Sequence, residues 1–480
     1  MLRKLFRGLV LLILGLAVAG GILYAFGLRV VFDGGGGMAL AFIKSPEQRA
    51  AEIEKHREAQ RAQAPAEMAP NVMAPPPAAD DTAPASPATE KPATDVVNPS
   101  AHWTNFRGPD RDGHYRQQPV RTDWGGPINP LWKQPIGGGY GSIVIAGGRA
   151  FTIEQRGARE LAAAYDVQTG RELWTSSWDA QFEGSPGGGG PRATPTWDDG
   201  RVFVLGATGE FRSIDAATGR TLWRTNILAD AGAANTDHGT SASPLVVDNT
   251  VVVLPGGSNG QSVVAYDRQS GKRVWSALDD RPAYSSPMLV TLAGVRQILA
   301  HTETRLVGLS PENGTVLWEF PWQTPYASAQ PLITAPDRVF ISAESDAAML
   351  QLVADADGQL TARDLWRTTR MNNKFTSAVL HDGFIYGLDE AILACIDAST
   401  GDLKWKGGRY GYGQVMLASG HLIVLTEEGE LALVRADPAS HQEVTRFPAI
   451  EGKTWNHPAM SDGILLIRNI EEMAAFDLRR

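Results

Sequence analysis

The chain has a single cysteine among its 480 residues. Cys395 stands in the apolar run AILACID, so an internal disulfide is excluded and a buried, inert thiol is expected. The same count excludes a zinc site built on cysteines, and none of the nine histidines has the spacing of an HExxH or similar ligand motif. The sequence therefore predicts neither a disulfide framework nor metal chemistry.

Clustered positive charge is also missing. The formal net charge is −9, and lysine and arginine are scattered along the chain instead of forming a stripe. A nucleic-acid binder needs a basic face to meet the phosphate backbone, so no nucleic-acid partner is expected.

Long apolar runs are absent apart from one, GLVLLILGLAVAGGILYAFGL at residues 8–28. It is uncharged and long enough to cross a bilayer core of about 30 Å. Arg3, Lys4 and Arg7 precede it, and only Arg29 follows closely. This bias predicts a single-pass inner-membrane protein with a cytoplasmic N-terminus and an extracytoplasmic, periplasmic bulk.

A cleaved signal peptide is the competing interpretation, because Ala17-Val18-Ala19 resembles a cleavage site. The apolar run continues past that point through Phe26, which is longer than a signal peptide needs. We therefore expect residues 1–33 to form an uncleaved transmembrane anchor.

Residues 34–100 are expected to form a linker, charged at first and then rich in alanine and proline, and from Ala64 to Pro99 it lacks the apolar side chains that would offset the entropy of ordering. From Ser45 to Gln63 the segment is charged and Ala-rich, which predicts a short solvated helix. From Ala64 to Pro99 it is rich in alanine and proline, which predicts a disordered spacer between the membrane and the next domain.

From residue 101 onward the chain is repetitive. A small or polar residue, two or three apolar residues, a tight turn and a β-rich run recur eight times, as in ATPTWDDGRVFVL and ASPLVVDNTVVVL. The copies are 37 to 52 residues apart, the range of propeller blades. Aligned on the turn, the equivalent positions are Ile143, Pro195, Pro244, Pro287, Pro331, Ala378, Val415 and Pro458.

A second signature alternates with the first: an Asp that ends a strand, a Gly four residues on and a Trp eight residues on, as in DAATGRTLW from Asp215. The Asp can bond the turn amides, the Gly accepts positive φ, and the Trp can wedge between neighbouring sheets and donate its indole N–H to the next blade. Phe447 takes the slot in one repeat. Trp174, Trp223, Trp275, Trp318 and Trp405 fit this spacing, with Ser310 in place of the Asp before Trp318, and Trp366 takes the slot after a longer, irregular turn. Together with Trp132 at the start of the domain, these are the docking tryptophans that the sequence predicts.

These repeats predict an all-β, eight-bladed β-propeller over residues 101–480. The last copy has no Trp of its own, whereas Leu131-Trp132-Lys133 has no inner strands before it. We expect this N-terminal strand to complete the last blade and close the ring, which removes exposed sheet edges. A TIM barrel would need helices between the strands, and a solenoid would need capped ends.

The repeated pattern resembles the tryptophan-docking repeat of pyrroloquinoline quinone (PQQ)-like eight-bladed propellers. That family includes quinoprotein alcohol dehydrogenases and the outer-membrane assembly protein BamB. The segment WTNFRGPDRDG from Trp103 resembles the opening of a bacterial subgroup of such propellers, and the resemblance implies that Arg107, Asp110 and Asp112 lie in a loop on the face of the ring.

The resemblance leaves three functions open. A quinoprotein dehydrogenase would bind PQQ with Ca²⁺, use an Asp as base and commonly carry a disulfide of adjacent cysteines, which a single cysteine cannot form. There is also no CxxCH haem motif, and no Ca²⁺ ligand set or catalytic residue can be assigned. A BamB-like scaffold without cofactor, binding protein partners in the cell envelope, is the preferred hypothesis, with a membrane helix in place of the lipid-bearing cysteine. A ligand-sensing propeller is the third.

A ligand would enter the central funnel. The residues three positions before the aligned ones are Tyr140, Arg192, Ser241, Tyr284, Ser328, Phe375, Tyr412 and Trp455, and the propeller places them around one mouth of the channel. Such aromatics with one arginine could clamp an extended peptide, a sugar or a planar anion, or they could simply plug the channel. Glu183 and His238 stand in loops at the same rim.

Overall fold

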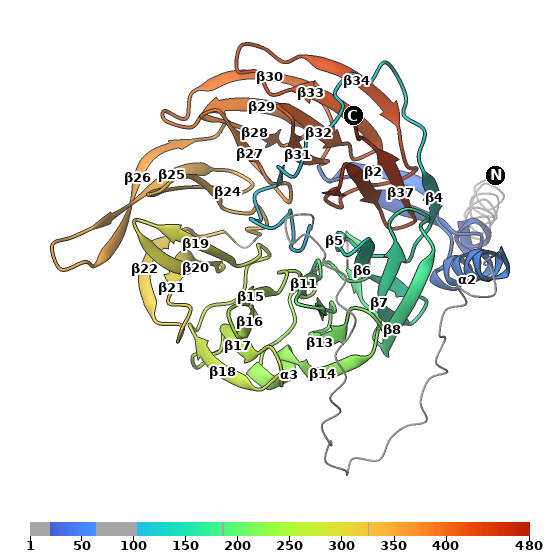
Figure 1. Ribbon diagram of the computed structural model, residues 1–480, viewed down its shortest axis with the longest axis horizontal. Helices are drawn as coiled ribbons and strands as arrows, with labels where there is room; N and C mark the ends of the chain where they lie inside the picture. Colours follow the sequence, from blue (N-terminus) through green and yellow to red (C-terminus); the bar gives the residue numbers. More distant parts are fainter. Residues whose placement is uncertain (1–19, 64–102, 185–186, 325) are drawn as a thin grey trace, which may run out of the picture.

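The computed structural model describes residues 20–63, 103–184, 187–324 and 326–480. Within them, eight antiparallel sheets of at least four strands stand side by side around a central axis (Figure 1). The predicted eight-bladed β-propeller is confirmed.

The blades follow one another along the chain, and the strands of each run from the channel outward in sequence order, except that the outer strand of the last blade, β4, comes from the start of the propeller. The first four blades consist of β5 Val144–Ala146, β6 Arg149–Arg156, β7 Arg159–Asp166 and β8 Glu172–Asp179; β11 Thr196–Asp198, β12 Arg201–Leu205, β13 Glu210–Asp215 and β14 Thr221–Asn226; β15 Leu245–Val247, β16 Thr250–Val253, β17 Val263–Asp267 and β18 Arg273–Ala277; β19 Met288–Leu292, β20 Val295–His301, β21 Arg305–Leu309 and β22 Val316–Pro321.

The last four blades consist of β23 Leu332–Ala335, β24 Arg338–Ser342, β25 Ala347–Ala354 and β26 Leu360–Thr368; β27 Val379–His381, β28 Phe384–Asp389, β29 Ile392–Asp397 and β30 Leu403–Arg409; β31 Gln414–Ala418, β32 His421–Leu425, β33 Glu430–Arg435 and β34 Glu443–Pro448; β35 Ala459–Ser461, β36 Ile464–Arg468, β37 Glu472–Asp477 and β4 Trp132–Pro135. The strand β3, His114–Tyr115, adds to the inner edge of β31 in parallel.

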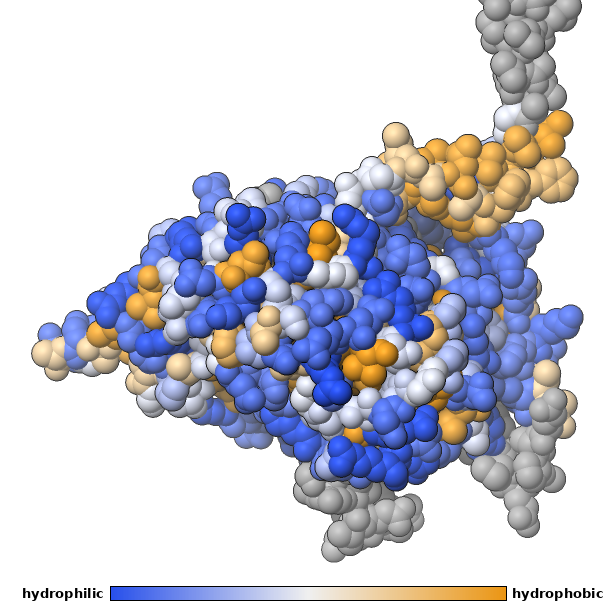
Figure 2. Space-filling model, turned by 90° about the horizontal axis from the view of Figure 1, so that it is seen from above, coloured by the Kyte–Doolittle hydropathy of each residue, from blue (hydrophilic) through white to orange (hydrophobic). Residues whose placement is uncertain are grey.

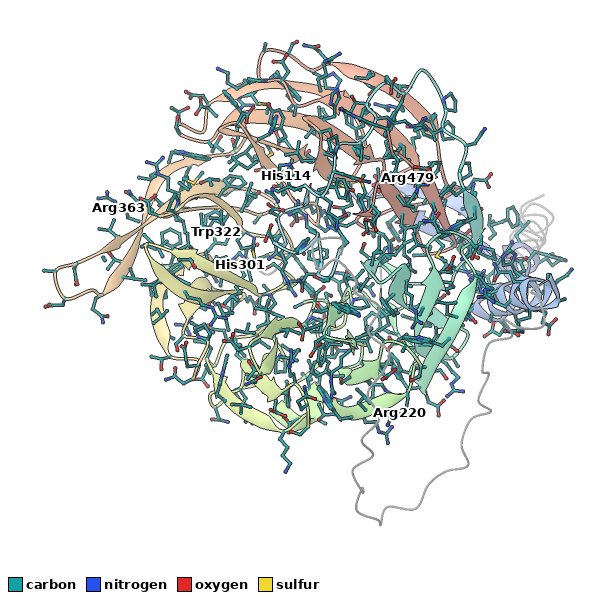
Figure 3. All side chains as sticks on the ribbon, viewed as in Figure 1. His114, Arg220, His301, Trp322, Arg363 and Arg479 are labelled. Carbon is teal, nitrogen blue, oxygen red and sulfur yellow. The ribbon has the colours of Figure 1, made fainter. Side chains whose placement is uncertain are left out.

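The core lies between neighbouring blades. The middle strands are covered on both faces, so they read as continuous apolar runs such as RVFVL in β12. Exposed and buried positions separate accordingly in Figure 3. Arg220 and Arg363 lie on the outer edge of the ring, and His301 and Trp322 lie in its interior.

The tryptophans join blade to blade. Trp174 Nε1 donates to the Ala216 carbonyl in the next blade at 3.1 Å, and its ring covers Gly219, where a Cβ would meet the indole at 2.7 Å. Gly219 has φ +78°, so the turn and the close approach both require glycine here. The same indole bond joins Trp132 to Val167, Trp223 to Arg268, Trp275 to Pro311, Trp366 to Ala398 and Trp405 to Asp437.

Trp318 differs from the other tryptophans. Its indole donates to the side-chain oxygen of Gln297 within its own blade. The next blade offers no compact turn to receive it, because β25 and β26 continue outward as a long hairpin that turns at Asp355–Gly358 (Figure 1). Phe447, which takes the Trp slot one blade from the end, is buried with its ring 6.2 Å from Phe476.

The two ends of the repeat region meet in the last blade. The strand β4 pairs antiparallel with β37, with Trp132 opposite Ala475 and Pro135 opposite Glu472. The N-terminal strand therefore closes the ring, as its isolated Trp indicates.

The helix α2, Pro46–Gln63, exists as predicted, but it is not solvated on all sides. Ile53 and Arg57 are 2% and 1% exposed because they pack on the seam where β4 closes the ring. Arg57 donates to Gln134 Oε1 at 2.7 Å and lies 3.3 Å from the Glu172 carboxylate. The expectation of a free helix is corrected, because one buried arginine fastens it to the propeller.

The predicted membrane anchor is only partly covered by the structure. Most of the run at residues 8–28 lies outside the described residues, and no helix among the residues that are described has the length and apolarity to span a bilayer. Residues 20–25 are helical, and the chain then turns at Gly27 into the hairpin of β1 Leu28–Phe32 and β2 Met38–Phe42. A helix that continues to Leu28, as the apolar run predicts, is thus corrected. The Ala/Pro-rich spacer lies outside the described residues.

Candidate functional site

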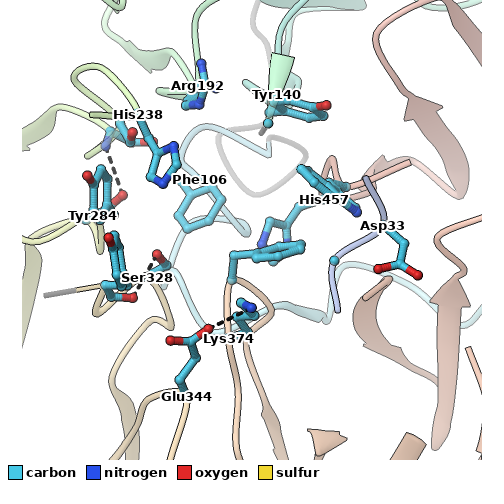
Figure 4. Close-up of a pocket in the computed structure, with 18 of the residues that line it drawn as sticks. Asp33, Phe106, Tyr140, Arg192, His238, Tyr284, Ser328, Glu344, Lys374 and His457 are labelled. Carbon is cyan, nitrogen blue, oxygen red and sulfur yellow. Dashed lines mark hydrogen bonds and ion pairs between the residues drawn. The ribbon is translucent and has the colours of Figure 1, made fainter. Parts of the chain in front are cut away.

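One mouth of the central channel opens into a cavity of about 410 Å³. The loops that lead into the inner strands bring their side chains together here (Figure 4). Of the residues that the repeat alignment places at this mouth, the cavity is lined by Tyr140, Arg192, Ser241, Tyr284, Ser328, Phe375 and Trp455. His238 also lines it, whereas Tyr412 lies beside Phe375 at the rim and Glu183 lies outside it in β9, Glu183–Gly184, which pairs with β10, Gly188–Gly189.

Arg192 is the principal charge of the wall. Its guanidinium donates to the carbonyls of Gly188 and Gly190 at 2.9 and 2.8 Å and lies 5.6 Å from the centre of the Tyr140 ring. Glu183 and Glu160 act on it only electrostatically, and no carboxylate of the described residues forms an ion pair with it. Burial lowers the pKa of Arg192, but a guanidinium stays charged at neutral pH. The cavity therefore presents a cation whose charge is not neutralised by a contacting acid.

Two groups of aromatic rings face each other across the cavity (Figure 4). On one side Trp455 lies 5.1 Å from Tyr140 and 4.7 Å from Phe375. On the other side Tyr284 stacks on Tyr326 at 6.3 Å, with the His238 ring 5.5 Å from Tyr284. Burial lowers the pKa of His238, so this imidazole is neutral near pH 7. The two walls can hold a flat or extended group between them.

The floor comes from the WTNFRGPDRDG segment. Phe106 rises into the cavity and meets the His457 ring edge-on at 4.8 Å. Burial next to the positive charge of Arg107 holds the pKa of His457 well below its usual range, so the floor is an uncharged, mostly apolar surface.

Below the floor, the next residues of the same segment fill the channel. Arg107 is buried and donates to the Ala378 carbonyl at 2.8 Å, so its expected place in a loop on the face of the ring is corrected. Arg111 donates to the carbonyls of Pro244, Pro287 and Ser243, the latter two at 2.8 and 3.3 Å. Burial lowers the pKa of Arg107 to about 10 and that of Arg111 to about 9. The inner strands end in carbonyls that need donors, and the two arginines supply them.

The rim is organised by Glu427, which follows strand β32. The structure buries it, and its carboxylate accepts hydrogen bonds from the Trp455 indole at 2.8 Å and from the Tyr412 and Gly34 amides at 3.0 and 2.7 Å. Glu427 thereby fixes the ring of Trp455 at the cavity wall.

The hydrogen bond from the Gly34 amide to Glu427 holds the turn of the β1–β2 hairpin, residues 33–37, at the mouth of the funnel. Asp33, Gly34 and Gly36 line the cavity, and Lys453 donates to the Phe32 carbonyl at 3.3 Å. Gly34 packs so closely on the Tyr412 ring that a Cβ would overlap it. The funnel is thus a joint product of the propeller and of the segment before it.

Comparison with known proteins identifies the family. A family model for the outer membrane protein assembly factor BamB matches residues 158–407. The chain belongs to the BamB family. BamB of Bordetella pertussis is 24% identical over 290 residues, which are 58% of this chain and 68% of that protein. BamB of Yersinia pestis is 23% identical over 314 residues, 62% of this chain and 76% of that protein.

Solved structures agree on the fold of this BamB-family chain. BamB from Moraxella catarrhalis superposes with a TM-score of 0.54 at 14% identity, covering 73% of this chain and 99% of that one. Quinohemoprotein alcohol dehydrogenase from Comamonas testosteroni superposes with a TM-score of 0.57 at 12% identity, covering 80% and 81%. At such identities the likeness concerns the architecture alone.

The donor set of this BamB-family funnel does not fit PQQ with Ca²⁺. Calcium takes six to eight oxygen ligands, mostly carboxylates and carbonyls. The described lining holds two carboxylates, Asp33 in the hairpin turn and Glu344, which is paired with Lys374 at 2.7 Å. No group of three metal-binding side chains occurs in the part of the chain that the structure describes.

Proposed function

We propose that this BamB-family chain is a non-catalytic scaffold for proteins of the cell envelope. The apolar run that begins at residue 8 tethers it to the inner membrane, and the propeller lies in the periplasm. The relatives named above are outer membrane assembly factors, which supports an assembly role, and the basic residues before the apolar run support the orientation.

The funnel carries the proposal. It is an open cavity with two aromatic walls, an uncharged floor and a cation without an ion-pair partner, and it lacks a nucleophile placed beside a base among the described lining residues. Such a surface binds without performing chemistry. A partner inserts an extended segment between Tyr284 and Trp455, and a carboxylate or carbonyl of that segment pairs with Arg192.

Site-specific crosslinking in cells tests this proposal. A photoreactive amino acid replaces Tyr284 in the funnel or, as a matched control, Val274, which is 53% exposed on the outer strand β18. We expect crosslinks to an envelope protein from position 284, reduced at least several-fold by R192A, and none to that protein from position 274. Crosslinks that ignore R192A, or that are equal at both positions, would contradict a funnel-bound partner.

A soluble ligand is the second candidate, because the cavity volume lies within the range of small-molecule sites. Calorimetry on the whole chain with PQQ and Ca²⁺, and with sugars and aromatic carboxylates, separates the two. We expect no binding of PQQ with Ca²⁺. Tight, Ca²⁺-dependent binding would overturn the scaffold assignment, and saturable binding of another solute that W455A abolishes would favour the ligand-sensing alternative.

A further inference from the structure

The β1–β2 hairpin has one wholly apolar face. Residues directly opposite each other in an antiparallel pair share a face, and here the pairs are Leu28 with Phe42, Val30 with Leu40 and Phe32 with Met38. The opposite face carries Arg29, Val31, Ala39 and Ala41. Six large apolar side chains therefore lie together on a two-stranded sheet, which we call the apolar hairpin face.

This face is turned away from the propeller. Val30, Met38, Leu40 and Phe42 are 53%, 75%, 69% and 65% exposed. Ile22, Leu23, Tyr24 and Phe26, immediately before the hairpin, are also exposed, so half of the large exposed apolar side chains of the described residues fall within 21 positions. Figure 2 shows them as a continuous apolar surface that stands off the body of the ring. Exposed apolar surfaces of this extent mark interaction sites.

The hairpin is held in place despite its exposure. Its turn is fixed at the funnel rim by the Gly34 to Glu427 hydrogen bond and the Lys453 to Phe32 hydrogen bond, and its far end continues into the fastened helix α2. The apolar hairpin face therefore has a set orientation relative to the funnel.

The chemistry of the surroundings points to a lipid bilayer as the occupant. The hairpin directly follows the uncharged run at residues 8–28 in the sequence. Its border carries an interfacial pair, because the Arg29 guanidinium lies 3.7 Å from the centre of the Tyr24 ring and donates to the Tyr24 carbonyl. Tyrosine and arginine are the residues that favour the level of lipid headgroups.

We infer that the apolar hairpin face lies in the surface of the membrane and holds the funnel mouth beside it. The inference rests on the proposed membrane placement and adds a second contact to the tether. A sheet that buries one face at the headgroup level while its ends remain attached to the protein behaves as an interfacial anchor.

The test places a fluorophore on either face of the same strand. Cys395 is buried and burial raises the pKa of its thiol to about 12, so an introduced cysteine is labelled selectively. The whole chain carrying L40C, on the apolar hairpin face, is compared with the chain carrying A39C, on the opposite face. Both positions are exposed, so neither change disturbs packing. Each labelled protein is reconstituted into phosphatidylethanolamine and phosphatidylglycerol vesicles that contain lipids with spin-labelled acyl chains.

The expected result is quenching at position 40 at least several-fold stronger than at position 39. Protein that floats with the vesicles but shows equal or no quenching at the two positions would overturn the inference and leave the tether intact. Protein that does not float would overturn both. The face would instead be assigned to a second copy of the chain if two results came together in the absence of lipid. The fluorophore at position 40 would show blue-shifted emission that resists quenching, and copies of the chain would crosslink to each other.

Discussion

The two ends of the central channel are built from the same kinds of residue and end up opposite in character. At the end below Phe106, Arg107 and Arg111 donate their N–H groups to backbone carbonyls at the starts of several inner strands. At the open end, Arg192 bonds only two carbonyls of its own loop and faces a cavity. The difference indicates that a buried arginine in this ring is a structural tie where several strands converge on it; where they do not, as at Arg192, it can take the binding role proposed above.

Replacing Arg111 tests the end below Phe106 and has the largest expected effect. R111M leaves the carbonyls of Ser243, Pro244 and Pro287 without their donor, which outweighs the relief of a buried charge and lowers the free energy of unfolding by about 3 kcal/mol. Denaturant titration of the whole chain measures it. The control R116M removes an exposed arginine that lies shortly after the segment and changes stability by less than about 0.5 kcal/mol. A similar loss in both variants would contradict the role of Arg111 as a tie.

Acidification tests the cavity floor, where His457 lies between the two ends of the channel. The pKa of His457 in the folded protein lies well below the ordinary value of 6.5, so the unfolded chain binds the proton first as pH falls. Stability from this group is complete above pH 6.5 and falls progressively as pH drops below it. Unfolding curves at a series of pH values should show a shallower acid loss in H457Q than in the unchanged chain. An equal slope would show that protonation of His457 makes no contribution to acid unfolding.

Replacing Arg192 tests the open end. R192M loses two hydrogen bonds close to solvent, so the free energy of unfolding falls by only about 1 kcal/mol. Binding at the funnel, measured by the crosslinking yield from position 284, should fall much more. If R192M is as destabilising as R111M, the distinction between the two ends fails.

The smallest expected effect on global stability concerns the turn at the rim. G34A adds a Cβ that overlaps the Tyr412 ring, so the turn is expelled while the propeller stays folded. Hydrogen exchange should accelerate at residues 33–37 with no measurable change in the unfolding midpoint. The neighbouring G35A is the control, because its nearest contact would be an ordinary 3.4 Å. Unchanged exchange in G34A would show that the turn is not held by this contact.

The propeller ring could be predicted because the residues that define each blade lie close together in the sequence. Each blade repeats an Asp, a Gly and a Trp at fixed spacing, and the isolated Trp132 indicates the closing strand. The funnel positions follow from the same alignment, since a fixed offset from each inner strand maps to one height in the channel. Trp318 departs from the pattern because its partner blade lacks the compact turn, an irregularity visible in the sequence after Val353.

The rest depends on contacts between distant segments. In the sequence Glu427 looks like an ordinary acidic loop residue. It holds the rim together because it accepts hydrogen bonds from Gly34, 393 positions away, and from Trp455. Phe106 and Tyr326 line the cavity from loops outside the repeat, and Arg57 is buried by docking of a helix whose composition suggests solvent on every side. The sequence repeat does not encode such contacts between distant segments.

The shared last blade also sets the order in which the protein folds. Seven blades can form from neighbouring strands, whereas the pairing of β4 with β37 must bring Trp132 to Ala475 across nearly the whole propeller. Closing a loop of that length costs roughly 5 kcal/mol of chain entropy, so this pairing comes last and the sheet edges stay open until it does. Arg57 of α2 then bridges Gln134 and Glu172 over the finished seam. The step that completes the ring is therefore the step at which an unfinished chain is most exposed to aggregation.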